Sequence, residues 1–363
     1  MARRGENIYK RKDGRWEGRY RTGFDAAGKP KYRSIYAKTY HEVKSKLSVL
    51  KVNPIQYTSS GNLTVKELFT DWLDAVRRRV KESTYANYRM KFEKHIFPSF
   101  GGYAYDKLNA KAVYTFIEQK IRTGLSVKYV ADIIVVFKSA CKYISKEYGY
   151  NNPLLNVMLP KAEKKEMRLF SEQQQILLCQ HLMNDVDFTK LGVLLSYYTG
   201  IRIGELCALK WSDFDFERGV LNIRRTVQRI SETYNNRSTR ILIDVPKSKS
   251  SIRSIPLPSF LLSLLKKYNR STTNYLLSGT KKVIEPRTMQ YRFKALLKKA
   301  KLPSINFHSL RHMFATNCVK LGFDIKTLSE LLGHSSVDTT LNRYVHSSLE
   351  RKKACMDLLT AVV

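Results

Sequence analysis

Hydrophobic and polar positions divide the chain into three stretches, and the first alternates with a period of two. Aromatic and basic side chains alternate along residues 7–10, 15–21 and 31–36. Asp13-Gly14 and Ala27-Gly28-Lys29-Pro30 are turn signals between these runs, so a three-stranded meander is predicted. Apolar residues then recur at helical spacing over 39–50, which predicts a helix that caps the sheet.

The second stretch has the three-and-four spacing of amphipathic helices. Residues 53–62 are polar and turn-rich, which predicts a linker. Thr64-Val65-Lys66-Glu67 has the form of a capping box and begins the first helix. Three further helices are expected from Ser83, over 110–121 and over 126–148. The pattern predicts a helical bundle.

The third stretch mixes helical and strand patterns and runs to the end of the chain. A helix start is expected at Ser171, an apolar helix over 191–198, and helices from Arg287 onward with breaks at Pro303, Gly322 and Gly333. Short strands are expected over 219–225, 240–245 and 252–257. The predicted fold class is multidomain and mainly α with small β-sheets, with domains over 1–55, 63–155 and 166–363.

The net charge of the chain predicts a binding partner. The 363 residues contain 65 Lys and Arg against 31 Asp and Glu, a formal net charge of +34. An excess this large would repel itself in a compact monomer, so a polyanion, expected to be DNA, is the predicted partner. The five scattered cysteines are interpreted as reduced thiols, and no signal peptide or membrane segment is evident, which predicts a cytoplasmic protein.

Basic residues concentrate in the first two predicted domains. Fifteen Lys and Arg against five Asp and Glu fall within residues 1–60, so one face of the small sheet is expected to be basic. A second run follows the first helix of the bundle. The candidate DNA-binding residues are Arg15, Arg19, Arg21, Lys31, Arg33, Arg77, Arg78, Arg79, Lys81 and Arg89. A solvated charged surface is the alternative interpretation for each of them.

Candidate chemistry gathers in the last third of the chain. His308-Ser309-Leu310-Arg311-His312 precedes Leu332-Gly333-His334-Ser335, and Tyr344 follows ten residues after His334. Upstream lie Thr199-Gly200-Ile201-Arg202-Ile203-Gly204-Glu205-Leu206 and a lysine-rich turn before Arg253-Ser254-Ile255-Pro256-Leu257. Basic groups that converge on one hydroxyl favour phosphodiester chemistry with a tyrosine nucleophile.

These five blocks, in this order over about 150 residues, resemble the catalytic domain of the tyrosine recombinases, the family of phage integrases and chromosome-dimer resolvases. The two upstream domains also match that family's layout. The resemblance implies a helical, SAM-like core-binding domain over 63–155, preceded by an arm-type DNA-binding domain over 1–55 as in integrases of mobile elements.

Each motif residue has a role that its chemistry suits. Arg202 and Arg311 are planar donors for the charge that grows on a phosphate during attack, and Glu205 is expected to orient one of them. His308 lies one helical turn before Arg311. The resemblance implies that His308 assists deprotonation of the tyrosine or bonds a phosphate oxygen. His334 is expected to donate to the scissile phosphate, and Tyr344 to attack it.

The general acid for the departing 5′ oxygen is expected to be a lysine on a flexible hairpin. Lys247 and Lys249 both qualify. The resemblance favours Lys247, which directly precedes a serine, but Lys249 also does. Zinc on His308 and His312 is the metal alternative and is disfavoured, because no Glu accompanies the pair and Arg311 would lie beside the cation. No metal and no cofactor are predicted.

The sequence therefore predicts an integrase that cuts and rejoins double-stranded DNA at core-type and arm-type sites, through a 3′-phosphotyrosyl link, to move a phage or conjugative element. A homotetramer on two duplexes is expected, with accessory excision or DNA-bending proteins as possible partners, in a bacterial cytoplasm. A resolvase or type IB topoisomerase and a catalytically silent DNA-binding regulator are the alternatives. The tail from Ser348 to Val363 is predicted to dock on a neighbouring subunit.

Overall fold

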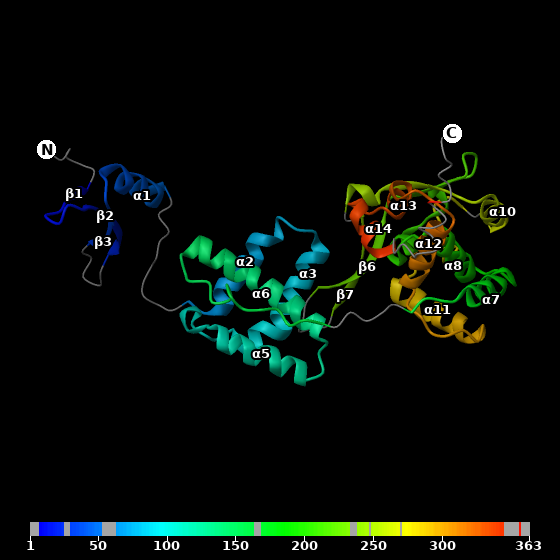
Figure 1. Ribbon diagram of the computed structural model, residues 1–363, viewed down its shortest axis with the longest axis horizontal. Helices are drawn as coiled ribbons and strands as arrows, with labels where there is room; N and C mark the ends of the chain where they lie inside the picture. Colours follow the sequence, from blue (N-terminus) through cyan, green and yellow to red (C-terminus); the bar gives the residue numbers. More distant parts are fainter. Residues whose placement is uncertain are drawn as a thin grey trace. The chain divides into compact units, whose positions relative to one another are not determined.

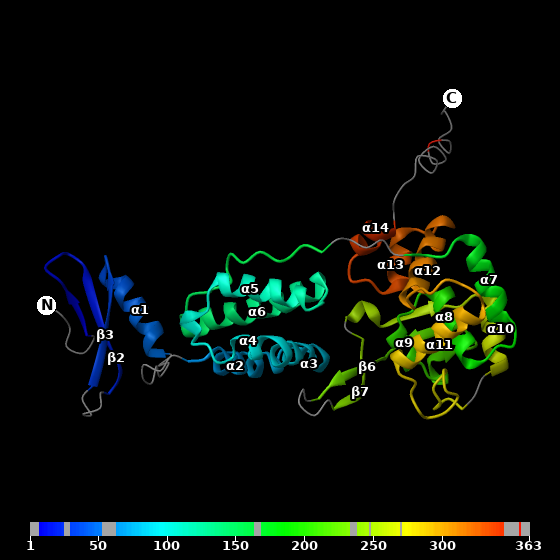
Figure 2. The same ribbon diagram turned by 90° about the horizontal axis from the view of Figure 1, so that it is seen from below.

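The computed structural model describes residues 7–24, 30–52, 63–162, 168–232, 238–246, 248–268, 271–344 and 356. Helices dominate, and the strands form three small antiparallel sheets, as Figures 1 and 2 show. The predicted fold class is confirmed. The predicted linker over 53–62 and nearly all of the C-terminal tail lie outside the described residues.

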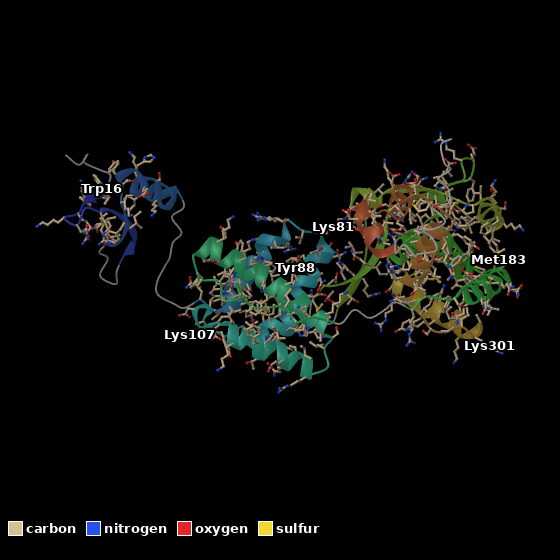
Figure 3. The ribbon with its side chains drawn as sticks, viewed as in Figure 1. Trp16, Lys81, Tyr88, Lys107, Met183 and Lys301 are labelled. Carbon is tan, nitrogen blue, oxygen red and sulfur yellow. The ribbon has the colours of Figure 1, made fainter. Side chains whose placement is uncertain are left out.

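The N-terminal module is the predicted meander with one helix on it. Strands β1 (Ile8–Lys10), β2 (Trp16–Phe24) and β3 (Pro30–Ala37) pair antiparallel in that order, and helix α1 spans Tyr40–Val52. Trp16, labelled in Figure 3, packs with the small core that α1 supplies. A Cβ at Gly18 would come within 2.5 Å of Val43, so only glycine lets α1 lie this close to β2.

The helical stretch begins with the predicted capping box. The Thr64 amide donates to Glu67 Oε2 at 2.8 Å, and the Glu67 amide donates to Thr64 Oγ1 at 3.2 Å. The helices are α2 (Val65–Arg77), α3 (Glu82–Lys91), α4 (Phe97–Phe100), α5 (Ala110–Arg122) and α6 (Val127–Tyr148), with a π-helical turn at Phe92–Ile96 and a 3₁₀ turn at Tyr105–Lys107. The π-helical turn and α4 were not predicted.

The C-terminal stretch begins with α7 (Glu172–Met183), whose capping box at Ser171 and Gln174 confirms the predicted helix start. Helices α8 (Phe188–Thr199) and α9 (Ile203–Ala208) follow, and α10 (Ser259–Tyr268) and α11 (Pro286–Lys299) lie further along the chain. The last three helices are α12 (His308–Lys320), α13 (Ile325–Leu332) and α14 (Val337–Tyr344). Their ends agree with the predicted breaks at Pro303, Gly322 and Gly333.

Two small sheets lie among these helices. Strands β4 (Phe214–Asp215), β5 (Val220–Ile223) and β8 (Arg253–Pro256) form one, and β6 (Thr226–Ser231) and β7 (Thr239–Asp244) form a hairpin. Two 3₁₀ turns, at Trp211–Asp213 and Lys249–Ser251, flank the strands. The strand expected over 219–225 is present as β5, which ends at Ile223, two residues earlier than expected. Arg225 pairs with Asp213 at 2.7 Å, and β6, which begins at Thr226, was not predicted.

Helix α8 is the centre of the main hydrophobic core. Leu191 to Tyr197 are all buried, and they pack with apolar side chains from α7, α9, α10, α11 and α12. A smaller cluster joins Ala315, Cys318 and Val319 of α12 to Leu328 and Leu332 of α13. Helices α12, α13 and α14 lie side by side in both views (Figures 1 and 2). The apolar packing therefore fixes the ends of α8, α12 and α13 relative to one another.

Contacts divide the chain into two compact units. One comprises Met1–Trp72, Phe97–Glu118 and Lys138–Val157, and the other comprises Leu73–Ile96, Gln119–Phe137 and Met158–Val363. All the candidate catalytic residues belong to the second unit, and the division into three domains stays a prediction. Within the described part of the chain, no helix is long and apolar enough to cross a membrane.

Candidate active site

Arg202 owes its place to the glycine that ends α8. Gly200 has a φ of +63° and caps α8 in the left-handed conformation. A Cβ there would come within 2.5 Å of Phe314 and 2.9 Å of Leu332, so α8, α12 and α13 meet closely at this point. The chain then turns, and Arg202 becomes the N-terminal cap of α9 with its side chain 36% exposed.

Glu205 is the carboxylate partner that the sequence predicted for an arginine. Its side chain is 2% exposed and accepts from the Arg202 amide at 3.0 Å and from Arg202 Nη1 at 2.8 Å. Arg253 Nη2 donates at 3.0 Å to Glu205 Oε2, the oxygen that also accepts from the Arg202 amide. Burial by itself would raise the pKa of the Glu205 carboxyl, but Arg253 and Arg202 together lower that pKa below its ordinary value. Glu205 therefore stays ionised between two guanidinium groups.

Arg311 lies on the first turn of α12, where it is 2% exposed. Its Nη1 donates to the Gly200 carbonyl at 2.8 Å and its Nη2 to the Leu332 carbonyl at 2.6 Å. One guanidinium thus joins the C-terminal ends of α8 and α13. These ends carry carbonyls without helical partners, which favour a cation.

Three arginines bond three successive carbonyls at the C-terminal end of α13. Arg253 Nε donates to Leu331 at 2.6 Å, Arg311 Nη2 to Leu332 at 2.6 Å, and Arg202 Nη2 to Gly333 at 3.1 Å. Gly333 caps α13 with a φ of +65°, and His334 follows it. The structure therefore gathers two predicted catalytic arginines, and one more, around the turn that carries a predicted histidine.

His334 is joined to the last helix of the described chain. Its Nδ1 lies 2.8 Å from Oγ1 of Thr340, a fully buried residue on α14. Tyr344 ends α14, one helical turn after Thr340. The Tyr344 side chain lies outside the described part of the structure. The helix that bears Tyr344 is thus fixed to the histidine turn through Thr340.

His308 and His312 share one side of α12. His308 is the first residue of the helix and is exposed, and its amide donates to Asn306 Oδ1 at 3.0 Å. The buried His312 ring meets the His308 ring edge to face, with centroids 4.8 Å apart. His312 therefore lies in the packed interior and supports the His308 ring.

The two lysine candidates cannot be separated on geometry. Lys247 lies outside the described residues. Lys249 begins the 3₁₀ turn that precedes β8, and its side chain lies outside the described part as well. The backbone of this turn comes close to the arginine group, because the Ser251 carbonyl accepts from Arg253 Nη1 at 3.0 Å.

Two of the predicted DNA-binding residues of the N-terminal module, Arg19 and Arg21, share one sheet face. In the β2–β3 register Glu17, Arg19 and Arg21 lie opposite Tyr36, Ser34 and Tyr32, away from Gly18, which contacts α1. Glu17 accepts from Arg19 and Arg11, so it neutralises part of this face. Arg15 pairs with Asp13 at 2.8 Å.

Arg33 differs from the others. Its register partner is Tyr20, so it belongs to the face of Gly18 and Ile35, against which α1 packs. Lys31 pairs with Gly23 beyond a β-bulge. The side chains of Arg21, Lys31 and Arg33 lie outside the described part.

The basic run after α2 divides into exposed and engaged residues. Arg77, Arg78 and Arg79 are exposed at the end of α2. Lys81, labelled in Figure 3, donates to Asp244 Oδ2 at 3.1 Å and to the Val245 carbonyl at 2.7 Å. Arg89 donates to the Ser231 carbonyl at 3.1 Å. Lys81 and Arg89 are therefore engaged with the β6–β7 hairpin in this structure.

Two residues of the site were missed from the sequence. Arg253 lay in a motif block that carried the resemblance, yet received no role there. Its side chain is only 6% exposed, and an arginine beside an apolar strand pattern was the available signal. Thr340 lies one helical turn before Tyr344, a spacing that could have marked it as a neighbour of the nucleophile.

Two family models match this chain, one over the C-terminal stretch and one over the helical stretch before it. Residues 170–351 match the model of the phage integrase family. Residues 64–121 match that of the phage integrase N-terminal SAM-like domain. The first match contains every candidate catalytic residue, and the second covers α2 to α5.

Relatives extend over most of the chain. A tyrosine recombinase XerC-like protein of Caldanaerobacter subterraneus subsp. tengcongensis is 27% identical, covering 93% of each chain. The ICEBs1 integrase of Bacillus subtilis is 24% identical, covering 83% of each chain.

Solved structures share the fold. The integrase of transposon Tn1549 in complex with a circular intermediate DNA matches with a TM-score of 0.66 at 24% identity, covering 82% of this chain and all of that one. A lambda integrase dimer bound to a COC′ core site matches with a TM-score of 0.59 at 17% identity, covering 95% of this chain and 97% of that one.

Proposed function

The chain belongs to the phage integrase family of tyrosine recombinases, which cut and rejoin DNA, and from this premise we propose that it integrates and excises a mobile element by way of Tyr344. The observation that carries the proposal is the arrangement of Arg202 and Arg311 around the turn before His334. That turn is fixed through Thr340 to the helix that ends in Tyr344. Phosphate binding and the nucleophile thus come from one connected structure.

Strand cleavage begins with attack of the Tyr344 hydroxyl on the scissile phosphorus. The P–O bond to the tyrosine forms as the P–O bond to the 5′ oxygen breaks, which leaves a 3′-phosphotyrosyl link. Negative charge grows on the non-bridging oxygens in the pentacoordinate transition state. Arg202, Arg311 and His334 supply positive charge and donors there, and burial of the Arg311 side chain strengthens this field.

Two protons move during this step. The Tyr344 hydroxyl loses one, and the exposed His308 at the start of α12 is suited to accept it. The departing 5′ oxygen gains one, and Lys247 is the proposed donor, with Lys249 as the alternative. Rejoining reverses both transfers when a 5′ hydroxyl attacks the phosphotyrosyl link.

We also propose that the reaction needs neither metal nor ATP. The phosphotyrosyl link retains the energy of the broken phosphodiester bond, so ligation by an incoming 5′ hydroxyl is close to isoenergetic with cleavage. The charge compensation that a divalent cation gives in other phosphoryl transfers is assigned here to two arginines.

The same proposal extends to partners and place. Recombination exchanges strands between two duplexes, and four tyrosines are needed for the four strand cuts, so a homotetramer is the working assembly. The basic face of β2 and β3 is assigned to arm-type sites and the basic run over 77–79 to core-type sites. We further propose that accessory excision or DNA-bending proteins act with this protein. Its proposed location is the bacterial nucleoid.

The test is recombination in a defined reaction. Purified protein is incubated with a plasmid that carries the joined ends of the element and one that carries the chromosomal target, with EDTA and without nucleotide. We expect recombinant product from the wild-type chain and none from Tyr344→Phe. Product that requires Mg²⁺ or ATP would overturn the metal- and ATP-independent step, and equal product from Tyr344→Phe would overturn the nucleophile.

A further inference from the structure

Arg253, the arginine that the sequence left without a role, connects several segments of the site. Three separate nitrogens of Arg253 donate to three acceptors, two of them in distant parts of the chain and one in the turn just before β8. Nη2 donates to the Glu205 carboxylate at 3.0 Å, Nε to the Leu331 carbonyl at 2.6 Å, and Nη1 to the Ser251 carbonyl at 3.0 Å. One guanidinium therefore meets α9, the end of α13, and the turn that begins with Lys249.

Burial makes these bonds obligatory. The Arg253 side chain is 6% exposed and Glu205 is 2% exposed, so neither charge can exchange its partner for water. A guanidinium left without acceptors in such a place is strongly unfavourable. The three acceptors consequently hold their positions relative to Arg253 whenever the domain is folded.

Each of the three contacts leads to a proposed catalytic group. Glu205 also accepts from Arg202 Nη1 at 2.8 Å. Leu331 lies three residues before His334, and a Cβ at Gly333 would come within 3.1 Å of the Arg253 Cδ atom, so the side chain packs on that turn. Ser251 ends the 3₁₀ turn that begins with Lys249, one of the two lysine candidates.

We propose that Arg253 is a positioning residue. It holds Arg202, the turn before His334 and the turn that begins with Lys249 in the relative positions that strand cleavage needs. The inference rests on the proposed function, because it concerns the same reaction. Arg253 itself does not touch the phosphate in this scheme. It acts through Glu205, through the Leu331 carbonyl and through the Ser251 carbonyl.

Lysine cannot replace arginine in this role. Its single nitrogen can approach one or two of the three acceptors, whereas the planar guanidinium donates in three directions at once. Arg253→Lys therefore retains the positive charge beside Glu205 and removes the connection between the three segments.

The control is a second arginine–carboxylate pair in the same part of the chain, in which the carboxylate is buried and the arginine is partly exposed. Arg225 Nη2 lies 2.7 Å from Asp213 Oδ2, and Asp213 is buried. Within the described structure Arg225 donates to Asp213, which is not a proposed catalytic residue. Arg225→Lys is expected to lower the unfolding midpoint and to leave the cleavage rate of the folded protein unchanged.

The experiment measures single-turnover cleavage of a nicked core-site duplex, DNA affinity and the unfolding midpoint for the wild type, Arg253→Lys and Arg225→Lys. All rates are taken well below the lowest midpoint. We expect Arg253→Lys to cleave at least about tenfold more slowly, the cost of about one lost hydrogen bond, with DNA affinity unchanged. Its rate should also fall off at a higher pH on the acid side, because Glu205 loses the guanidinium hydrogen bond that helps to keep its pKa below the ordinary value.

Two outcomes overturn the inference. One is wild-type cleavage by folded Arg253→Lys. The other concerns a double-mutant cycle: if Arg253→Met and Glu205→Gln lower the rate by factors that multiply in the double variant, Arg253 does not act through Glu205. Both require that the wild type cleaves. Absence of cleavage by the wild type would instead count against the proposed function.

Discussion

Oγ1 of Thr340 lies 2.8 Å from Nδ1 of His334, and this bond joins the turn that carries His334 to the helix that ends in Tyr344. Thr340 is fully buried, so its hydroxyl has no water to replace the histidine. The bond fixes the orientation of the ring and directs Nε2 away from α14. Placement of the histidine and placement of the nucleophile are therefore coupled.

Thr340→Val tests this coupling. The substitution keeps the branched shape and removes the hydroxyl, so the His334 ring loses its fixed partner. We expect single-turnover cleavage to fall about tenfold, the value of one hydrogen bond, with DNA affinity unchanged. Thr339→Val, one position earlier and exposed, is the control and should cleave as the wild type does. Equal rates for the two variants would contradict the coupling.

Gly333→Ala tests the need for a close approach behind His334. A Cβ there would lie 2.9 Å from the Ser250 carbonyl oxygen, and the φ of +65° adds about 1–2 kcal/mol of strain for any other residue. Gly322, with a φ of +83° and open space around its Cβ position, is the matched control. Both variants should lose stability in urea unfolding, but only Gly333→Ala should lose cleavage, by about tenfold or more. If both glycine variants cleave at the wild-type rate, the turn before His334 tolerates displacement and the prediction is wrong.

Glu205→Gln tests the shared carboxylate. It leaves Arg202 and Arg253 without their common anion, and we expect a loss of about 3 kcal/mol in the free energy of unfolding near neutral pH. Because the folded-state pKa of Glu205 lies below its ordinary value of 4.5, its stabilisation is complete above that value and disappears as the pH falls through the folded-state pKa. The difference between wild type and variant in urea unfolding should therefore shrink below the ordinary value. A difference that does not change with pH would show that the carboxylate charge is not responsible.

Lys247→Ala and Lys249→Ala identify the general acid. A substrate whose 5′-bridging oxygen is replaced by sulfur has a leaving group that needs no proton. We expect Lys247→Ala to be slow on the ordinary substrate and to recover its rate on the sulfur substrate, whereas Lys249→Ala should show a small defect that sulfur does not relieve. Recovery by Lys249→Ala alone would assign the role to Lys249.

Local patterns predicted local structure well. The capping box at Thr64 and Glu67, the alternation along β2 and β3, and the breaks at Gly322 and Gly333 depend on neighbouring residues, and all are present in the structure. The interruption between β5 and β6 lies at Arg225, which pairs with Asp213, twelve residues away. The hydrophobic periodicity of the sequence does not indicate such a contact. The π-helical turn at Phe92–Ile96 likewise has no pattern that distinguishes it from an α-helix.

In the candidate site too, local motifs were predicted and long-range contacts were not. Motifs singled out Arg202, Glu205 and Arg311, and the structure places the three around the ends of α8 and α13. That these arginines bond successive carbonyls could not be inferred, because the carbonyls belong to the backbone and any residue supplies one. Arg253 was overlooked for this reason: two of its three acceptors, Glu205 and the Leu331 carbonyl, are distant in sequence and only the fold brings them to it.

Covalent capture on DNA is the most direct test of Tyr344 as the nucleophile. A half-site duplex with a nick close to the scissile phosphate loses a short fragment after cleavage, so the protein stays attached to the 3′ end. Proteolysis followed by mass spectrometry then identifies the attached residue. The account predicts a 3′-phosphotyrosyl peptide that contains Tyr344 for the wild type and no adduct for Tyr344→Phe. An adduct on another residue, or the same yield from Tyr344→Phe, would contradict it.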